Sequence, residues 1–441
     1  MRSRATDPSL MTEPGGPPGP FRRSFWRSPV RGPWLTSVFG LLLLVSIPVM
    51  FATGLLFYAA YNPGLDPVND TTPGKGLLGF YLFSWPTNPY WLYRVTQGTH
   101  VTLGLTLVPI LLFKLWSVLP KLFEWPPLRS PAHMLERLSL FLLVGGAVFE
   151  FVTGILNIQT WYPFPTSFYT LHFYGAWVFI AGFVVHVPLK LPTMFRALRS
   201  RSFWGELRTN LAHTRPEPPD AGYLAPVAPA PATISRRGVI AFAGAGSALI
   251  AALSVGQSLG GSWRRTALLA PHNQQVSGAS AGDFQVNNTA RNAGIVATET
   301  GEKWRLTMLA VGTDGQPGHP VVLSRGDLLR MEQHNASLPI ACVEGWSTDN
   351  QAWTGVRLRD LAAMAGVTSP SSVLVQSLQH GGGFSQAALS AGQIMDQDSL
   401  LALRVNGADL TLDHGYPARV IVPDCPGVHN TKWVNRLTFR S

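Results

Sequence analysis

"LTSVFGLLLLVSIPVMFATGLLFYAAY" occupies residues 35–61 and decides the class of the protein. The stretch has no charged side chain and is long enough to cross a hydrocarbon core of ~30 Å as a helix. Three similar stretches follow at 95–119, 135–158 and 168–191, and a fifth lies at 238–259. With 46% hydrophobic and 13% charged residues among 441, the composition is too apolar for a purely soluble protein. We therefore expect a multi-pass membrane protein.

Basic residues flank alternate ends of these spans and predict their orientation. Six lie in the N-terminal tail, four lie in the second-to-third connection and the span ends beside it (Lys114, Lys121, Arg129 and Arg137), and eight lie from Lys190 to Arg237. The other connections hold only Lys75 and Arg94. By the positive-inside rule the N-terminus is cytoplasmic and the chain beyond the fifth span lies outside. The net charge of +10 therefore belongs to membrane flanks, and we expect no nucleic-acid partner.

Composition divides the chain into five parts. Residues 1–34 are a Pro/Gly/Arg tail expected to be disordered, 35–200 an all-α transmembrane four-helix bundle, 201–235 a Pro/Ala-rich cytoplasmic linker, 236–260 the fifth span, and 261–441 an extracytoplasmic domain. Strand-like runs such as 418–423 and helix-like runs such as 357–366 predict a mixed α+β fold for the last part. No convincing internal repeat is apparent.

The fifth span opens with "ISRRGVIAFAGAGSALIAALSVG" from Ile234. Arg236 and Arg237 ahead of a weakly apolar run resemble a bacterial twin-arginine export signal. Such a signal would carry the following domain across the membrane already folded, after a cofactor made in the cytoplasm has been inserted. The alternative is that both arginines only flank an ordinary span on its cytoplasmic side.

Four histidines lie in or beside the spans, namely His100, His133, His172 and His186. An imidazole in hydrocarbon is costly and usually faces a functional interior. His172 and His186 are 14 residues apart, which is nearly four helical turns and therefore one face. His100 and His172 both lie near the outer ends of their spans, so we expect them to ligate an outer haem b, and His133 and His186 an inner one. Hydrogen-bonded structural histidines are the alternative.

The histidine spacing resembles that of the di-haem b-type cytochrome subunits of hydrogenases and formate dehydrogenases. The resemblance implies one or two haem b groups and electron exchange with quinone. Those cytochromes take a further ligand from the first span, which has no histidine here, and the residue 14 positions after His100 is Lys114. Glu150, a carboxylate within the third span, is a candidate acceptor for a quinol proton, with a structural hydrogen bond as the alternative.

The only two cysteines, Cys342 and Cys425, lie in the extracytoplasmic part, where an even pair usually forms a disulfide. The sequence "LPIACVEGWSTDNQAWTGVRLRDLAAMAGV" at 338–367 instead resembles the molybdopterin-binding domain of the sulfite oxidase fold, especially the catalytic subunit of the bacterial protein-methionine-sulfoxide reductase. The resemblance implies that Cys342 is the catalytic centre and the thiolate ligand of molybdenum. A soft thiolate suits a metal that changes oxidation state.

A second segment, "NGADLTLDHGYPARVIVPDCPGVHNTKWVNRLTF" at 406–439, resembles the closing pattern of the same family. The resemblance covers about residues 280–441 and implies cofactor contacts from His414, Arg419, Asn430, Thr431, Lys432, Ser377 and Asn287. Arginine and lysine beside backbone amides suit the pyrophosphate of a pterin cofactor. Ordinary surface polarity is the alternative for each of these residues taken alone.

The residues after Cys342 limit the substrate. Sulfite oxidases surround their cysteine with arginines that hold sulfite, whereas Val343 to Trp346 follow here, and only Arg357 or Arg404 are candidates for such a pocket. We expect a membrane-anchored molybdenum oxidoreductase of a bacterial cytoplasmic membrane, which transfers an oxygen atom to or from a small or protein-bound S- or N-oxide. Electrons would pass between haem b and the quinone pool. The alternative is a haem-binding electron carrier whose soluble domain binds pterin or a partner without catalysis.

Overall fold

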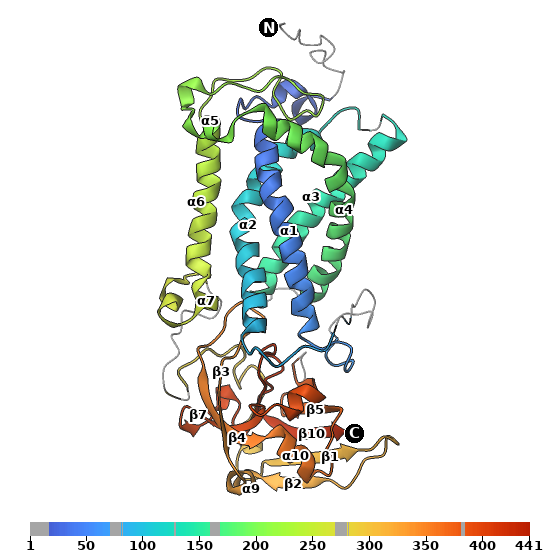
Figure 1. Ribbon diagram of the computed structural model, residues 1–441, viewed down its shortest axis with the longest axis vertical. Helices are drawn as coiled ribbons and strands as arrows, with labels where there is room; N and C mark the ends of the chain where they lie inside the picture. The colour runs from blue at the N-terminus through green and yellow to red at the C-terminus, as the bar shows by residue number, and fades with distance from the viewer. Residues whose placement is uncertain are drawn as a thin grey trace. The chain divides into compact units, whose positions relative to one another are not determined.

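The computed structural model describes residues 17–70, 81, 83–127, 129–158, 168–269, 280, 282–380 and 384–441 (Figure 1). The chain divides into two compact units. The first comprises Met1–Phe51, Leu103–Leu156 and Ser167–Ala251, and the second comprises Ala52–Thr102, Asn157–Thr166 and Ala252–Ser441. Each unit is described by itself below.

Five helices are long and apolar enough to cross a membrane, as the sequence predicts (Figure 1). They are α1 (Pro33–Ala59), α2 (Leu92–Leu122), α3 (Pro131–Asn157), α4 (Phe168–Ser200) and α6 (Arg236–Ser254), the last followed by the short α7 (Gly256–Leu259). Large apolar side chains on these helices remain exposed, among them Val45 and Val184. Exposed apolar surface of this kind is typical of helices that face lipid, and the five helices indicate that the protein associates with a membrane.

The first unit packs the long helices through two apolar clusters. One joins α1, α2 and α6, and the other joins α1, α2, α3 and α4; their buried members are Val30, Trp34, Leu35, Val38, Phe39, Leu107, Ile110, Val239 and Ala243, and Ile47, Leu111, Ala147 and Phe179. Gly146 lets α4 approach α3, because a Cβ there would lie 3.2 Å from Phe179 Cβ. Lys190 Nζ donates to Glu136 Oε1 at 2.6 Å, which fixes the same antiparallel register.

The expectation of a disordered tail up to residue 34 is wrong for its described part. Residues 17–34 contain the 3₁₀ helices Gly19–Phe21 and Arg23–Phe25, and Val30 and Trp34 are buried. The linker at 201–235 includes α5 (Phe203–Arg208), and Ala230 N donates to Arg27 O at 2.8 Å. The two segments are ordered because they pack on each other, whereas residues 1–16 lie outside the described residues.

Arg236, the first arginine of the predicted export signal, is buried at the start of α6, whereas Arg237 is exposed. The Arg236 guanidinium lies 3.4 Å from Glu206 Oε2 and donates to Pro29 O at 3.2 Å. Glu217 lies beside it and accepts from Trp34 N at 3.1 Å, where a carboxylate is favourable at the N-terminus of α1. Arg236 therefore has a structural contact in the folded unit, and its role in export stays a prediction.

The second unit contains two five-stranded sheets. The first has the order β2 (Val321–Ser324), β1 (Arg305–Val311), β10 (Val434–Arg440), β5 (Ser372–Ser377) and β6 (Gln386–Ser390), and only β1 and β10 are parallel. The second has the order β3 (His334–Leu338), β4 (Gln351–Arg357), β7 (Leu400–Val405) and β8 (Ala408–Asp409), with β9 (Arg419–Ile421) also on β7. Short helices lie before and between the strands, among them α8 (Ala297–Thr300), α9 (Arg325–Arg330), α10 (Leu358–Met364) and α11 (Ala391–Met395). The predicted mixed α+β fold is confirmed.

Alternation along the strands explains the core of this unit. Val373 and Val375 of β5 and Leu437 and Phe439 of β10 are fully buried, because successive side chains of a strand point to opposite faces. The sheets place two loops side by side, one after β3 and one between β9 and β10, where Ala341 bridges Pro426. These loops carry the candidate site.

Candidate active site and histidine sites

Cys342 lies in a tight turn between β3 and β4. Cys342 N donates to Trp346 O at 2.8 Å, and Gly345 N donates to Cys342 O at 3.3 Å. Gly345 has a φ of +97°, which glycine adopts without strain. A Cβ there would also lie 2.7 Å from Val101 Cγ1, so the turn packs against α2 one residue after His100.

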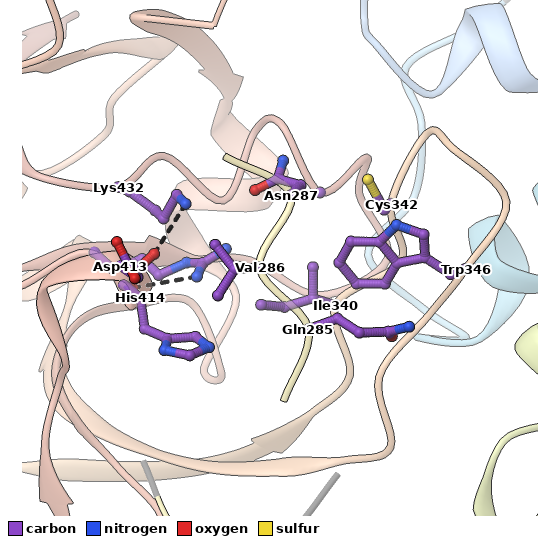
Figure 2. A pocket seen from close by; sticks show the side chains of 11 residues that line it. Gln285, Val286, Asn287, Ile340, Cys342, Trp346, Asp413, His414 and Lys432 are labelled. Carbon is purple, nitrogen blue, oxygen red and sulfur yellow. Dashed lines mark hydrogen bonds between the residues drawn. The ribbon is translucent and has the colours of Figure 1, made fainter. Parts of the chain in front are cut away.

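A pocket opens beside this turn (Figure 2). Its lining comes from four segments of the second unit: Gln285, Val286, Asn287, Ile340, Cys342, Trp346, Asp413, His414, Arg419, Gly427 and Lys432. Figure 2 shows Cys342 and Trp346 on one side of the pocket, with Lys432, Asp413 and His414 on the other. Five of the residues predicted to bind the cofactor therefore meet in one place: Asn287, Cys342, His414, Arg419 and Lys432.

Two of the lining residues, Arg419 and Lys432, are cations that form no ion pair with a carboxylate in the described part of the chain. Arg419 Nη1 donates to His414 O at 3.2 Å, and its buried Nε has no hydrogen-bond partner there. Lys432 Nζ donates to the carbonyl oxygens of Asn288 and Asp413. Burial lowers the pKa of Arg419 to about 9 and that of Lys432 to about 7. Buried cations without a counter-ion are costly, so this pocket favours an anionic ligand.

Both cysteines are buried and free, so the described structure contains no disulfide between them. Burial raises the pKa of the Cys342 thiol well above its usual value, and Glu344 adds to this effect. Cys342 Sγ lies 3.7 Å from Glu344 Oε2, which also accepts from Trp346 Nε1 at 2.9 Å. Cys425 instead contacts Val422 O and Asn430 Oδ1 at 3.4 and 3.5 Å, away from the pocket lining.

His414 is held as a neutral ring. Its Nδ1 lies 2.7 Å from Thr411 Oγ1 and its Nε2 lies 3.0 Å from Phe284 O. Burial lowers the pKa of His414 to about 4, and the neighbouring Arg419 acts in the same direction. The ring therefore contributes a polar, uncharged wall beside the two cations.

The other residues predicted to contact the cofactor do not line the pocket. Ser377 Oγ donates to Lys432 O at 2.7 Å, Asn430 Oδ1 accepts from Val422 N at 2.9 Å, and Thr431 Oγ1 donates to His429 O at 3.4 Å. These three side chains hold the backbone of the loop that carries Lys432. Arg357 and Arg404 also lie away from the lining, since Arg357 Nε donates to Gln397 O and Arg404 pairs with Asp409.

Six lining residues escaped the sequence reasoning: Gln285, Val286, Ile340, Trp346, Asp413 and Gly427. All but Trp346 lie within three positions of a predicted residue in the sequence, and this proximity was the signal that was available. Gly427 is required because a Cβ there would lie 2.9 Å from Ala341 O, where the two loops cross.

In the first unit, α3 and α4 hold His172 by its Nδ1. This nitrogen lies 3.1 Å from Thr153 Oγ1 and 3.1 Å from Glu150 Oε2. Thr153 Oγ1 in turn donates to Phe149 O at 2.7 Å, one helical turn earlier. Gly154 lets the ring lie close to α3, because a Cβ there would be 3.2 Å from His172 Cε1.

In the second unit, α1 and α2 hold His100 in the same way. His100 Nδ1 lies 3.2 Å from Thr53 Oγ1, and a Cβ at Gly54 would be 3.1 Å from His100 Cε1. The two helices responsible share a short sequence, "FATGLL" at 51–56 and "FVTGIL" at 151–156. The two stretches agree at four of six positions, which is a local similarity and not an internal repeat. We call Thr53 with His100, and Thr153 with His172, the Thr–His pairs.

His133 and His186, predicted to share an inner haem, lie at different levels. Because Gly146 faces Phe179 and Glu136 meets Lys190, His186 is level with about residue 140 of α3. His133 lies about seven residues nearer the start of that helix, or about 10 Å along it. His133 Nε2 is 3.7 Å from Oε1 of Glu124, a residue that lies beyond the end of α2.

Comparison with known proteins assigns the fold of the pocket. Residues 293–441 match the family model of the oxidoreductase molybdopterin binding domain. The chain is 31% identical over 137 residues to the uncharacterized oxidoreductase YuiH of Bacillus subtilis (strain 168), covering 31% of this chain and 65% of that protein. It is 31% identical to mitochondrial sulfite oxidase of Mus musculus, covering 30% of this chain and 28% of that one. It is 37% identical to NADH nitrate reductase of Hordeum vulgare, covering 19% and 10%.

These matches fall in the C-terminal part of the chain, which therefore contains a sulfite oxidase-type molybdopterin-binding domain of oxidoreductases. The chain spans about two thirds of YuiH and much less of the other two relatives. The predicted resemblance to the sulfite oxidase fold is confirmed at this level. The resemblance to methionine-sulfoxide reductase and to haem cytochromes stays a prediction.

Proposed function

We propose that the protein is a membrane-anchored molybdenum oxidoreductase that transfers an oxygen atom to or from an S- or N-oxide. The observation that carries the proposal is the pocket itself, in which a thiol and two cations without carboxylate partners converge from distant parts of the chain. Cys342 would ligate molybdenum through its thiolate, while Arg419, Lys432, His414 and Asn287 would hold the pterin pyrophosphate. When bound, such a cofactor supplies two-electron oxygen-atom transfer.

The residues present fit this cofactor. Arg419 Nε is a buried donor that lacks a partner among the described residues, and an oxyanion would provide one. The Cys342 thiol is protonated in the chain alone, because burial raises its pKa. Its proton has Glu344 Oε2 as a nearby acceptor when a metal takes the thiolate.

The pocket also bears on the substrate. Arg419 and Lys432 are the only cations among the described residues of its lining, and we assign both to the cofactor. Arg357 and Arg404, the remaining candidates for binding a sulfite dianion, are engaged elsewhere. We therefore favour a neutral or protein-bound S- or N-oxide over sulfite.

The helices would connect this chemistry to the membrane. We propose that His100 and His172 ligate a haem b that exchanges electrons with quinone, with Glu150 as a proton acceptor near His172. Val101 supports a short route between the two centres, since it follows His100 and packs on Gly345 in the turn of Cys342. The charge bias of the flanks supports a cytoplasmic N-terminus and a catalytic domain on the outer face of a bacterial membrane.

Metal and haem analysis of the purified protein tests the proposal. We expect about one molybdenum per chain, and haem absorbance that changes when a sulfoxide or N-oxide is added to the reduced protein. Absence of molybdenum in a cell that makes the cofactor would overturn the enzyme assignment and leave the electron carrier without catalysis. A larger response to sulfite than to either oxide would overturn the substrate class.

A further inference from the structure

In the Thr153–His172 pair, a hydrogen-bond relay bears on which ring nitrogen is protonated. Thr153 Oγ1 donates its hydrogen to Phe149 O at 2.7 Å. A hydroxyl has a single hydrogen, so toward His172 this oxygen acts only as an acceptor. The contact of 3.1 Å to His172 Nδ1 therefore requires a hydrogen on that nitrogen.

Glu150 strengthens the same state of His172. Its Oε2 lies 3.1 Å from Nδ1, so a carboxylate there is a second acceptor for the same hydrogen. With Nδ1 protonated, Nε2 of a neutral ring keeps its lone pair. Gly154 removes the Cβ that would push the ring from α3, so the ring is also fixed in position.

His100 repeats the arrangement on other helices. Thr53 Oγ1 lies 3.2 Å from its Nδ1, and Gly54 packs on its Cε1 at the place that Gly154 has beside His172. Both histidines have a threonine hydroxyl at Nδ1 and a glycine beside Cε1, supplied by two similar six-residue stretches, which indicates a shared task rather than two unrelated structural hydrogen bonds.

We propose that Thr53 and Thr153 are positioning residues that hold His100 and His172 with Nδ1 protonated and Nε2 presented to a haem iron. The proposal rests on the proposed function, in which His100 and His172 ligate a haem b. Metal-binding histidines usually donate their second ring N–H to a neighbouring acceptor, and loss of that acceptor typically lowers metal affinity by about 10- to 100-fold. The threonine hydroxyls would supply this acceptor from within the membrane helices.

The test compares Thr153→Val and Thr53→Val, which keep the side-chain shape, with Thr153→Ser and Thr53→Ser, which restore a hydroxyl. Thr106→Val is the matched control, because the buried Thr106 Oγ1 on α2 has no hydrogen-bond partner in the described part of the chain. ¹⁵N-histidine solid-state NMR of the full chain made without haem reports the protonated nitrogen directly, with His100→Gln and His172→Gln assigning the signals. Haem titration of the same chains reports affinity.

We expect Nδ1–H signals for both histidines. The His100 signal is lost in Thr53→Val and restored by serine, whereas the His172 signal shifts in Thr153→Val without being lost, because Glu150 remains as an acceptor. Haem affinity should fall about 10-fold in Thr153→Val and Thr53→Val but not in Thr106→Val. An Nε2–H signal for either histidine in the unaltered chain would overturn the proposal, as would valine variants with unchanged tautomer and affinity. Nδ1–H signals in a chain that binds no haem would contradict the proposed haem function while leaving the threonine relay intact.

Discussion

The Cys342 pocket and the Thr–His pairs are assembled in opposite ways. The pocket gathers residues from segments as far apart as Gln285 and Lys432, and its buried cations lack carboxylate partners among the described residues. Each Thr–His pair is made by two helices that follow one another in the chain, and its contact is between neutral groups except for Glu150. The difference indicates an anionic ligand for the pocket and a ligand held through ring nitrogens for the helices.

The largest expected effect is a difference in activity between variants of the two cysteines of the second unit. Cys342→Ser should lower oxygen-atom transfer by more than about 100-fold, because a metal ligand is lost rather than a residue that orients one. Cys425→Ser should change it less than about threefold, since the Cys425 thiol lies in the hydrophobic core and its hydrogen bonds among the described residues go to Val422 O and Asn430 Oδ1. Molybdenum content and turnover, measured together, check both variants.

The helices provide the control for this comparison. Haem absorbance should be the same in both cysteine variants, because the thiols of Cys342 and Cys425 make their hydrogen bonds among the described residues to Glu344, Val422 and Asn430. Full activity in Cys342→Ser would mean that the pocket is assigned to the wrong ligand. Equal losses in the two cysteine variants would mean that the loop is merely sensitive to substitution.

The same comparison shows what the sequence could provide. The five long helices were predictable because uninterrupted apolar runs have few other structures available. Cys342 and Arg419 were found through family resemblance, which identifies a loop but not which of its side chains point inward. For that reason Asn430 and Thr431 were predicted as cofactor contacts, although they bond backbone and neighbouring atoms.

The Thr–His pairs were missed for a different reason. Two six-residue stretches with four identical positions are easily overlooked where most residues are apolar. The meaning of Thr53 and Thr153 also depends on the register between two helices. Hydropathy does not encode that register, because any rotation that keeps apolar residues toward lipid satisfies it. Close packing at Gly54 and Gly154 sets it instead.

The pH dependence of stability should report on His429, a buried histidine of the second unit. His429 is buried, contacts the Tyr61 ring at 5.5 Å, and has a pKa lowered by burial to about 4 from its usual value of 6.5. Between pH 6.5 and 4 the unfolded chain binds a proton that the folded chain excludes, so stability falls with falling pH by about 1.4 kcal/mol per pH unit. His429→Phe should remove this contribution from the free energy of unfolding, measured in detergent at several pH values. At pH 8 the ring is neutral in both states, so any difference there reports packing alone, and an unchanged slope below pH 6 would contradict the assignment.

The smallest expected effect distinguishes the two Thr–His pairs from each other. Glu150 accepts from His172, whereas the residue at the corresponding place before Thr53 is Met50. A carboxylate on Nδ1 makes the ring a stronger electron donor and stabilises an oxidised metal on Nε2. Glu150→Gln should therefore raise the haem midpoint potential by less than about 59 mV, which is tenfold in a one-electron equilibrium, and Met50→Leu should leave it unchanged. Redox titration followed by haem absorbance measures both variants. A lower potential in Glu150→Gln would contradict a carboxylate acceptor at His172 Nδ1 and would overturn the role assigned to Glu150 in holding that tautomer.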